Sequence, residues 1–386
     1  MEQLLNNRVK NIEISGIRQF FNMVADKKDV LSLTIGQPDF PTPHHVKEKT
    51  KDAIDKNHTT YTPNAGILSL RKAITDFNNY NYHLNYNYES EVIVTVGASQ
   101  AIDVTLRTIL NEGDEVILPG PVYPGYEPLI TLAGGIPVHI DTRENQFKIT
   151  AQQIEQMITD KTKAIIIPYP SNPTGVTLSK AELEEIASVI NKHDVFLIAD
   201  EIYSELIYKD THVSIGSFMN IRDKVIIING VSKSHSMTGF RIGYILAAEW
   251  LTKQMLKVHQ YNVSCASSIS QYGALEAIEN GQNDSMEMKE IYQLRRDYVY
   301  DRLKKMNVVT YLPTGGFYFF VDISHLKEDS FTVALKLVEE AKVALVPGSA
   351  FSRFGEGFLR LSYAYDLETI KEGLDRIEPF IKKNTK

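Results

Sequence analysis

Cysteine is almost absent from this sequence, whose 386 residues include a single one, Cys265. One cysteine excludes a disulfide within the chain and suits a reducing compartment. Long apolar runs are missing as well, and residues 1–5 do not begin the apolar core of a signal peptide. We therefore expect a cytoplasmic protein without a membrane partner.

An excess of positive charge is also lacking. The 41 Lys and Arg residues are outnumbered by 48 Asp and Glu residues, which gives a net charge of −7. Such a chain has no broad basic face, so we expect no nucleic-acid partner. The content of 43% hydrophobic and 23% charged residues is ordinary for an enzyme, and the length suffices for one large and one smaller domain.

The most informative stretch runs from residue 230 to 243 and reads Gly-Val-Ser-Lys-Ser-His-Ser-Met-Thr-Gly-Phe-Arg-Ile-Gly. It follows a strand-like run, 225–228, so Lys233 is expected on a loop just past a buried strand, where sheet proteins place reactive groups. A desolvated lysine loses its proton more easily, and its most economical use is a Schiff base with an aldehyde cofactor. A solvated loop lysine is the ordinary alternative. Arg241, eight positions on, has the fork geometry that binds phosphate.

From residue 91 onward, apolar strand-like runs alternate with helical patterns. This predicts an α/β protein with a mostly parallel sheet between helices. A large domain is expected over residues 44–289 and a smaller α/β domain over residues 1–43 and 290–386. Predicted strands cover 91–96, 114–118, 163–167, 195–199, 315–321, 343–348 and 358–362, and a long helix is predicted over 287–302.

Small residues follow the first of these strands. Residues 97–100, Gly-Ala-Ser-Gln, are expected to form a turn before a helix at 101–110. Free backbone N–H groups and the helix dipole at such a place favour a phosphate, although small residues also serve merely to let the chain turn. Tyr123 lies in a loop rich in Pro and Gly, either as a packed tyrosine or as a flat ring for a flat cofactor.

Three further polar residues have two readings each. Asn172, in Asn-Pro-Thr-Gly, either bonds its own backbone or offers a side-chain donor. Asp200 ends an apolar strand, where a carboxylate is costly to bury without a positive partner such as a protonated pyridine nitrogen; capping a following helix is the rival account. Arg360 alternates with Leu359 and Leu361, which by itself favours the solvent face of a strand.

These motifs occur together and in a recognisable order. Asn172-Pro-Thr-Gly, Asp200 with Tyr203 three residues on, Ser232-Lys233 with Arg241, and Leu359-Arg360-Leu-Ser follow one another as in the class I/II aminotransferases. From about residue 31 to the C-terminal helix, the sequence resembles that family of fold type I enzymes, which depend on pyridoxal 5′-phosphate (PLP). The resemblance implies a large domain with a mostly parallel, seven-stranded sheet between helices. It also implies a homodimer with a shared active site, using amino-acid and 2-oxo-acid substrates.

The resemblance also implies a role for each candidate residue, and it implies no metal. Residues implied in catalysis are Lys233, Asp200, Tyr203 and Asn172. These four are also implied in holding PLP, together with Gly97, Ala98, Ser99, Tyr123, Ser232, Arg241 and, from the neighbouring subunit, Tyr61. Residues implied in binding the substrate are Gly36, Asn172 and Arg360.

Two positions depart from the pattern of the family. Gly230 stands where many relatives carry a phosphate-binding serine, so that Ser232 or Ser234 is left to compensate. Ser99 stands near a position where some aspartate-specific relatives have a lysine, which argues against that solution for dicarboxylates. The sequence from Tyr61 to Ile67 and the spacing of the motifs resemble most the branch that includes N-acetyl-diaminopimelate and aspartate/aromatic aminotransferases.

The expected function is transfer of an amino group from an L-amino acid to a 2-oxo acid, 2-oxoglutarate in the first place. N-acetyl-LL-diaminopimelate, an intermediate of bacterial lysine synthesis, is the preferred partner of this reaction, with aspartate or an aromatic amino acid as alternatives. A β-eliminating carbon–sulfur lyase on the same fold is the rival enzyme. A non-catalytic binding module is the rival from another class, and intact Lys233, Asp200 and Arg360 speak against it.

Overall fold

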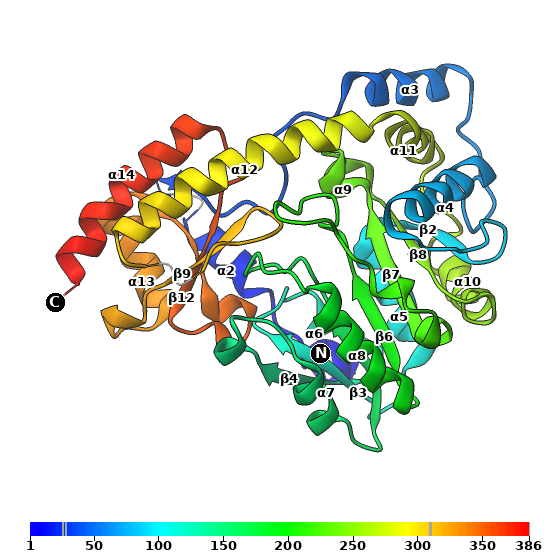
Figure 1. Ribbon diagram of the computed structural model, residues 1–386, viewed down its shortest axis with the longest axis horizontal. Coiled ribbons are helices and arrows are strands. Elements are labelled where there is room, and N and C mark those ends of the chain that lie inside the picture. Colours follow the sequence, from blue (N-terminus) through cyan, green and yellow to red (C-terminus); the bar gives the residue numbers. More distant parts are fainter. Residues whose placement is uncertain (25–26, 28, 309–310, 386) are drawn as a thin grey trace.

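A seven-stranded sheet forms the centre of the molecule. The computed structural model describes residues 1–24, 27, 29–308 and 311–385. In spatial order, the strands of the sheet are β2 (Val92–Val96), β8 (Ile242–Leu246), β7 (Val225–Gly230), β6 (Phe196–Asp200), β5 (Thr162–Ile167), β3 (Glu115–Gly120) and β4 (Ile136–Asp141) (Figure 1). β8 is antiparallel to both of its neighbours, and the other pairs are parallel. The predicted mostly parallel, seven-stranded sheet is thus confirmed.

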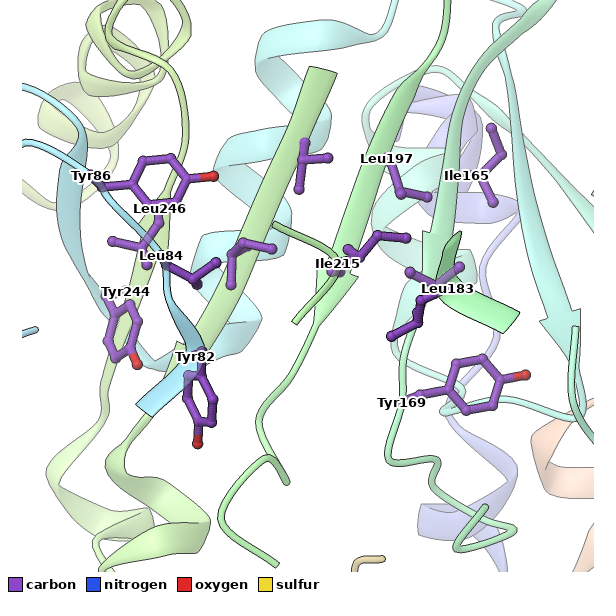
Figure 2. Close-up of a cluster of buried hydrophobic side chains, with 14 of the residues drawn as sticks. Tyr82, Leu84, Tyr86, Ile165, Tyr169, Leu183, Leu197, Ile215, Tyr244 and Leu246 are labelled. Carbon is purple, nitrogen blue, oxygen red and sulfur yellow. The ribbon is translucent and has the colours of Figure 1, made fainter. Parts of the chain in front are cut away.

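Helices cover both faces of this sheet, because alternate strand residues point to opposite faces and nearly all are apolar. On one face, Ile165 and Leu197 belong to a core that also contains Leu183 and Tyr244 (Figure 2). On the other face, Ile166 and Ile198 belong to a second core. The first core includes residues of α4 (Leu68–Tyr82), α7 (Ala151–Met157), α8 (Lys180–Lys192) and α11 (Ser268–Asn280), and the second includes residues of α5 (Gly97–Ile109), α6 (Tyr126–Leu132) and α10 (Glu249–Val263).

A third core brings the two ends of the chain together, with Phe20 and Leu33 packed in the same cluster as Leu361. β11 (Val346–Pro347), β12 (Phe358–Ser362) and β9 (Tyr318–Asp322) form a small antiparallel sheet in that order, and β1 (Leu31–Ser32) pairs in parallel with β10 (Val343–Ala344). The helices that contribute to this third core are α2 (Gly16–Val24), α12 (Gln282–Lys305), α13 (Ser330–Lys336) and α14 (Leu367–Asn384). α12 reaches from the end of α11 to α14 (Figure 1).

One further helix, α3 (His44–Asp55), contributes Val46 to the first core. The remaining helical segments are short. They are α1 (Asn7–Lys10), α9 (Val231–Ser234), a π-helical turn (Leu337–Ala341) and 3-10 turns at Glu2–Leu4, Arg143–Asn145, Ile215–Ser217, Met219–Lys224, Thr238–Phe240, Ser324–Leu326, Gly348–Phe351 and Arg353–Gly355. Within the described ranges, no helix combines the length and the apolar character that a bilayer crossing requires.

Three local expectations need correction. The segment 97–100 is the first turn of α5 and not a separate turn, because the side chain of Gln100 accepts a hydrogen bond from the backbone N–H of Val96 (2.7 Å) and so caps the helix start. Lys233 lies on the helical turn α9 and not on an irregular loop. The strand expected at 343–348 is divided into β10 and β11, because its two halves pair with different strands.

Candidate active site

A cavity of about 490 Å³ opens at the carboxyl ends of the parallel strands. Asp200 ends β6, Lys233 follows β7 and Asn172 follows β5, so the topology alone brings these side chains to one edge of the sheet. All of the predicted site residues except Gly97 and Tyr61 line the cavity, namely Gly36, Ala98, Ser99, Tyr123, Asn172, Asp200, Tyr203, Ser232, Lys233, Arg241 and Arg360.

Lys233 has no carboxylate partner in the described part of the chain. Its Nζ donates a hydrogen bond to the carbonyl oxygen of Gly36 (2.6 Å) and lies 5.9 Å from the ring centre of Tyr203. The pKa of the Lys233 amine is lowered from its ordinary 10.5 to about 8, chiefly by burial and then by the nearby cations Arg360 and Arg241, while the charge of Asp200 acts in the opposite direction. About a tenth of this amine is therefore uncharged and nucleophilic at pH 7, far more than for an ordinary lysine.

Asp200 is a buried carboxyl group, 7% exposed, and its hydrogen bonds in the structure come from neutral donors. Tyr126 Oη donates to one oxygen (2.7 Å) and the backbone N–H of Ile202 to the other (3.2 Å). Burial raises the pKa of Asp200 above its ordinary 3.8. The residues after it form turns and no helix, so the helix-capping alternative is wrong. This carboxyl group would gain from a positively charged ligand in the cavity.

Arg360 is 2% exposed, so the alternative that places it on the solvent face of a strand is wrong. Its Nη1 donates to Oδ1 of Asn172 (2.9 Å), its Nη2 donates to the carbonyl oxygen of Thr34 (2.6 Å), and its buried Nε has no partner in the described structure. Asn172 therefore does not serve only its own backbone, and its side-chain NH₂ remains a donor. A buried guanidinium without a carboxylate is a receptor for an anionic group of a ligand.

The start of α5 lies at another side of the cavity and suits a phosphate. Gly97 has a positive φ of 74°, and a Cβ atom there would collide with the guanidinium of Arg241. Arg241 is itself held at φ 55°, a strained conformation for a non-glycine residue, and donates to the carbonyl oxygen of Thr238 (3.0 Å). The helix N-terminus, this cation and the exposed side chain of Ser99 therefore lie close together.

The structure explains the glycine at position 230. A Cβ atom on Gly230 would lie 2.7 Å from the carbonyl oxygen of Ile242 and 2.8 Å from Cα of Gly243, so a serine does not fit there without movement of the backbone. Of the two candidate replacements, Ser232 lines the cavity, whereas the hydroxyl of Ser234 is hydrogen-bonded to Nδ1 of His235 (2.8 Å). Of the two serines, Ser232 is therefore the one at the cavity.

Tyr61 is not brought to the cavity within this chain. Its side chain is 88% exposed. An exposed aromatic side chain of this size is available to a second molecule, and its role across a subunit interface stays a prediction.

Sequence reasoning missed several residues that line the cavity. Tyr126 bonds Asp200, Tyr318 bonds Tyr203 (2.9 Å between the hydroxyl oxygens), and Ile17 and Phe21 of α2 form part of the wall. Tyr318 had a signal in its alternation with Phe317 and Phe319, but alternation does not say that one face meets a cavity. Ile17 and Phe21 recur at helical spacing in the sequence, which indicates the apolar face of a helix but no cavity.

The cavity beside the mostly parallel sheet combines a lysine of lowered pKa, a buried aspartate and two arginines that have no carboxylate partner among the described residues. Such a site suits an enzyme that handles anionic ligands. The model of the family "Aminotransferase class I and II" matches residues 28–377. The chain belongs to this family and is an aminotransferase. The enzymes of the family depend on PLP.

Individual relatives agree with this assignment. A Bacillus subtilis protein described as a "probable N-acetyl-LL-diaminopimelate aminotransferase" is 56% identical over 99% of this chain and 97% of its own length. The aspartate aminotransferase of Pyrococcus abyssi is 40% identical over 98% of both chains. Among solved structures, the aspartate aminotransferase of Thermus thermophilus with maleate superposes with a TM-score of 0.92 at 34% identity, over 97% of this chain and 99% of that one.

Proposed function

We propose that this aminotransferase binds PLP in the 490 Å³ cavity and moves an amino group from an L-amino acid to 2-oxoglutarate. The observation that carries the proposal is the pair of Lys233 and Asp200. Asp200 is buried and Lys233 is half-buried, and neither has an ion-pair partner in the described structure. The pKa values of both are shifted toward the neutral form, and the two residues lie at or just past the ends of neighbouring parallel strands. A ligand with an aldehyde and a basic ring nitrogen satisfies both groups at once.

The other residues fit the remaining parts of the same group. The start of α5, Ser99, Ser232 and Arg241 would hold the phosphate, and Tyr123, 38% exposed at the cavity wall, would lie against the ring. The NH₂ group of Asn172 and the hydroxyl of Tyr203 would donate to the phenolic oxygen. Tyr61 of a second subunit would complete the phosphate site, which makes the enzyme a homodimer. We propose residues 44–289 as the large domain and 1–43 with 290–386 as the small one.

Bound PLP supplies an electron-accepting ring for the bond that breaks at the substrate α-carbon. The chain does the rest. Arg360 holds the substrate carboxylate through its two terminal nitrogens and so fixes the α-carbon near Lys233. Nζ of Lys233, in its uncharged form, would take the proton from the α-carbon and pass it to C4′ of the cofactor, and the same transfer in reverse would complete the reaction with the 2-oxo acid. Asp200 holds a proton at the ring nitrogen, because its buried carboxylate is stabilised by the charge that this proton confers.

For the substrate, we propose N-acetyl-LL-diaminopimelate as amino-group partner, in lysine biosynthesis in the cytoplasm. The 56% identity to a protein described by that activity supports this choice. Aspartate or an aromatic amino acid is the alternative, supported by relatives at about 40% identity.

The test combines spectroscopy with a substrate panel. Purified protein should show a visible absorbance band of bound PLP, and borohydride should fix the cofactor on the Lys233 peptide, as read by mass spectrometry. Lys233→Ala should lose transaminase activity. N-acetyl-LL-diaminopimelate, aspartate and phenylalanine are then compared as donors to 2-oxoglutarate. A protein that cannot be loaded with PLP contradicts the proposal, and release of pyruvate and ammonia without an acceptor identifies a lyase instead.

A further inference from the structure

Tyr318, the first residue of β9, contacts three parts of the cavity at once. Its side chain is fully buried, and its hydroxyl oxygen lies 2.9 Å from that of Tyr203. The guanidinium carbon of Arg360 lies 4.4 Å from the centre of its ring. Its hydroxyl also limits the space beside Gly36, where an added Cβ atom would be 3.2 Å away.

The hydrogen bond between the two tyrosines has a direction that matters. Either hydroxyl is able to donate, and only a Tyr203 that accepts from Tyr318 keeps its own O–H free for a ligand. A guanidinium over the face of a phenol favours charge on that ring and so makes its hydroxyl the better donor. Arg360 is permanently charged and lies against the Tyr318 ring, whereas the Tyr203 ring has Nζ of Lys233 at 5.9 Å, an amine that is partly uncharged near neutral pH.

We propose that Tyr318 is a positioning residue: stacked on Arg360, it donates its hydroxyl proton to Tyr203 and so holds the O–H of Tyr203 toward the cavity as a strengthened donor. Hydrogen bonds in a chain polarise one another, so the loss of the first donor weakens the second. The inference rests on the proposed function, in which Tyr203 donates to the phenolic oxygen of PLP. The arginine of the substrate site thereby supports the tyrosine of the cofactor site.

The test uses the PLP-loaded enzyme and Tyr318→Phe, which keeps the ring over Arg360 and removes the donor. A weaker Tyr203 stabilises the anionic oxygen of the cofactor less, so the protonated form persists to higher pH. The midpoint of the absorbance change of the bound cofactor with pH should therefore rise by about 0.5–1 unit. Tyr203→Phe should raise it further in the same direction. The kcat should fall about tenfold or less, with KM for the amino acid nearly unchanged.

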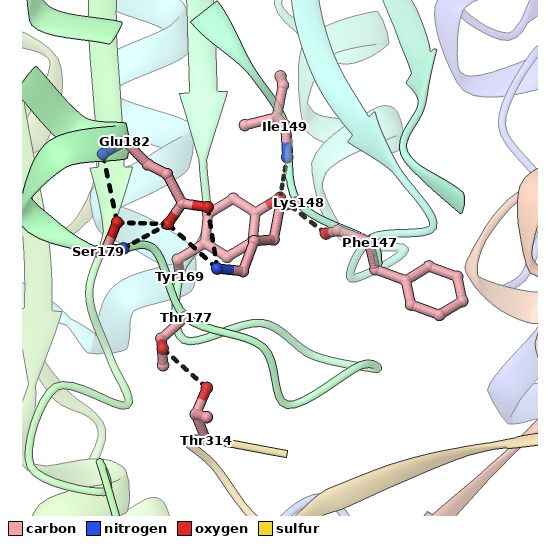
Figure 3. Close-up of polar contacts among 8 residues, drawn as sticks. All are labelled: Phe147, Lys148, Ile149, Tyr169, Thr177, Ser179, Glu182 and Thr314. Atoms are coloured by element: carbon pink, nitrogen blue, oxygen red, sulfur yellow. Dashed lines mark hydrogen bonds and ion pairs between the residues drawn. The ribbon is translucent and has the colours of Figure 1, made fainter. Parts of the chain in front are cut away.

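Two further variants separate positioning from general damage. Tyr318→Leu also removes the stacked ring, and KM should now rise together with the midpoint. Tyr169→Phe is the matched control, because it removes the hydroxyl of another buried tyrosine, which accepts from the N–H of Ile149 (2.9 Å) and donates to the carbonyl oxygen of Phe147 (3.1 Å) outside the cavity (Figure 3). Tyr169→Phe should lower the melting temperature as Tyr318→Phe does, but the midpoint of its cofactor titration should equal that of the wild type.

An unchanged or lowered midpoint in Tyr318→Phe overturns the inference, and so does an equal rise in Tyr169→Phe. The proposed function is judged separately on the wild type. If the wild type carries no cofactor band, the function fails first, whereas a wild type that titrates normally beside an unshifted Tyr318→Phe refutes only the role of Tyr318.

Discussion

Two polar regions of this molecule differ in whether their charged side chains have partners of opposite charge. At the start of α8, outside the cavity, Nζ of Lys148 lies 2.9 and 3.1 Å from the two carboxylate oxygens of Glu182 (Figure 3). Glu182 also accepts from the backbone N–H of Ser179 (2.6 Å), and the Ser179 hydroxyl accepts from the N–H of Glu182 (3.3 Å), which completes a capping box. In the cavity, Asp200, Lys233 and Arg360 have only neutral hydrogen-bond partners within the described residues.

The two carboxyl groups show what this difference means. Burial alone would raise the pKa of Glu182, but the backbone of Ser179 and the ammonium of Lys148 outweigh it and lower the pKa below its usual range. Burial raises the pKa of Asp200, and its weak neutral donors do not offset that effect. Glu182 therefore stabilises the fold, whereas Asp200 destabilises it until a cation enters the cavity. Charges that the fold leaves without partners are the ones a ligand must satisfy.

The largest effect that would test this contrast is expected from Asp200→Asn. Asparagine keeps the shape of the side chain but holds no negative charge near a ring nitrogen, so kcat/KM should fall by about 10²–10⁴. The melting temperature of the PLP-free protein at neutral pH should stay equal or rise, because the variant no longer buries an uncompensated charge. Both quantities are measured on the same preparations, by steady-state kinetics and by thermal unfolding.

The pH dependence of this gain follows from the sign of the shift. The folded pKa of Asp200 is above the unfolded value of 3.8, so the ionised carboxylate costs stability in full above the folded pKa, and the cost vanishes as the pH falls below about 3.8. The stability difference between Asp200→Asn and the wild type should therefore close in acid. If the variant melts well below the wild type at neutral pH, the Asp200 carboxylate stabilises the PLP-free protein, and the claim that it lacks a compensating partner is wrong.

A smaller effect is expected for the chemical reactivity of Lys233. With a pKa of about 8, against 10.5 for an ordinary lysine, its amine is deprotonated roughly 300 times more often at neutral pH. In the PLP-free protein, a limiting amount of an amine-reactive probe should modify Lys233 with a half-maximal rate near pH 8. Lys72, whose pKa is raised by its hydrogen bond to Asp76, is the internal control and should react only at higher pH. Mass spectrometry of the two peptides gives the extent of modification of each lysine against pH. If the two curves coincide, the pKa of Lys233 is not lowered relative to that of Lys72.

The sequence predicted the part of the fold that depends on uninterrupted apolar strands. Residues 195–199 and 225–228 are apolar because helices cover both faces of the sheet, so the end of each strand, and with it the positions of Asp200 and Lys233, was readable. Arg360 was harder, because an arginine between two leucines is usual on an exposed face. Only the order of motifs, and not local pattern, placed it in the site.

What remained hidden depends on packing between distant segments. Tyr126 reaches Asp200 across 74 positions and Tyr318 reaches Tyr203 across 115, and no local period indicates such contacts. The start of α5 was placed too late because Gly97 reads as a turn former, whereas the structure uses its positive φ and the side chain of Gln100 to begin the helix there. Tyr61 is exposed in the single chain, so its predicted role depends on a second subunit.

The smallest effect is expected on the structural side of the contrast, from Ser179→Ala. Loss of the helix cap should lower the free energy of unfolding by about 1 kcal/mol, while kcat/KM stays that of the wild type, because Ser179 does not line the cavity. Glu182→Gln is the matched variant, since glutamine preserves the capping box and removes only the charge that faces Lys148. Because the folded pKa of Glu182 lies below its unfolded value, its charge stabilises the fold above about pH 4.5 and loses this effect as the pH falls through the folded pKa. Urea unfolding should therefore show a larger difference in stability between Glu182→Gln and the wild type at pH 7 than at pH 3. A change in kcat/KM in either variant would show that the two regions are coupled.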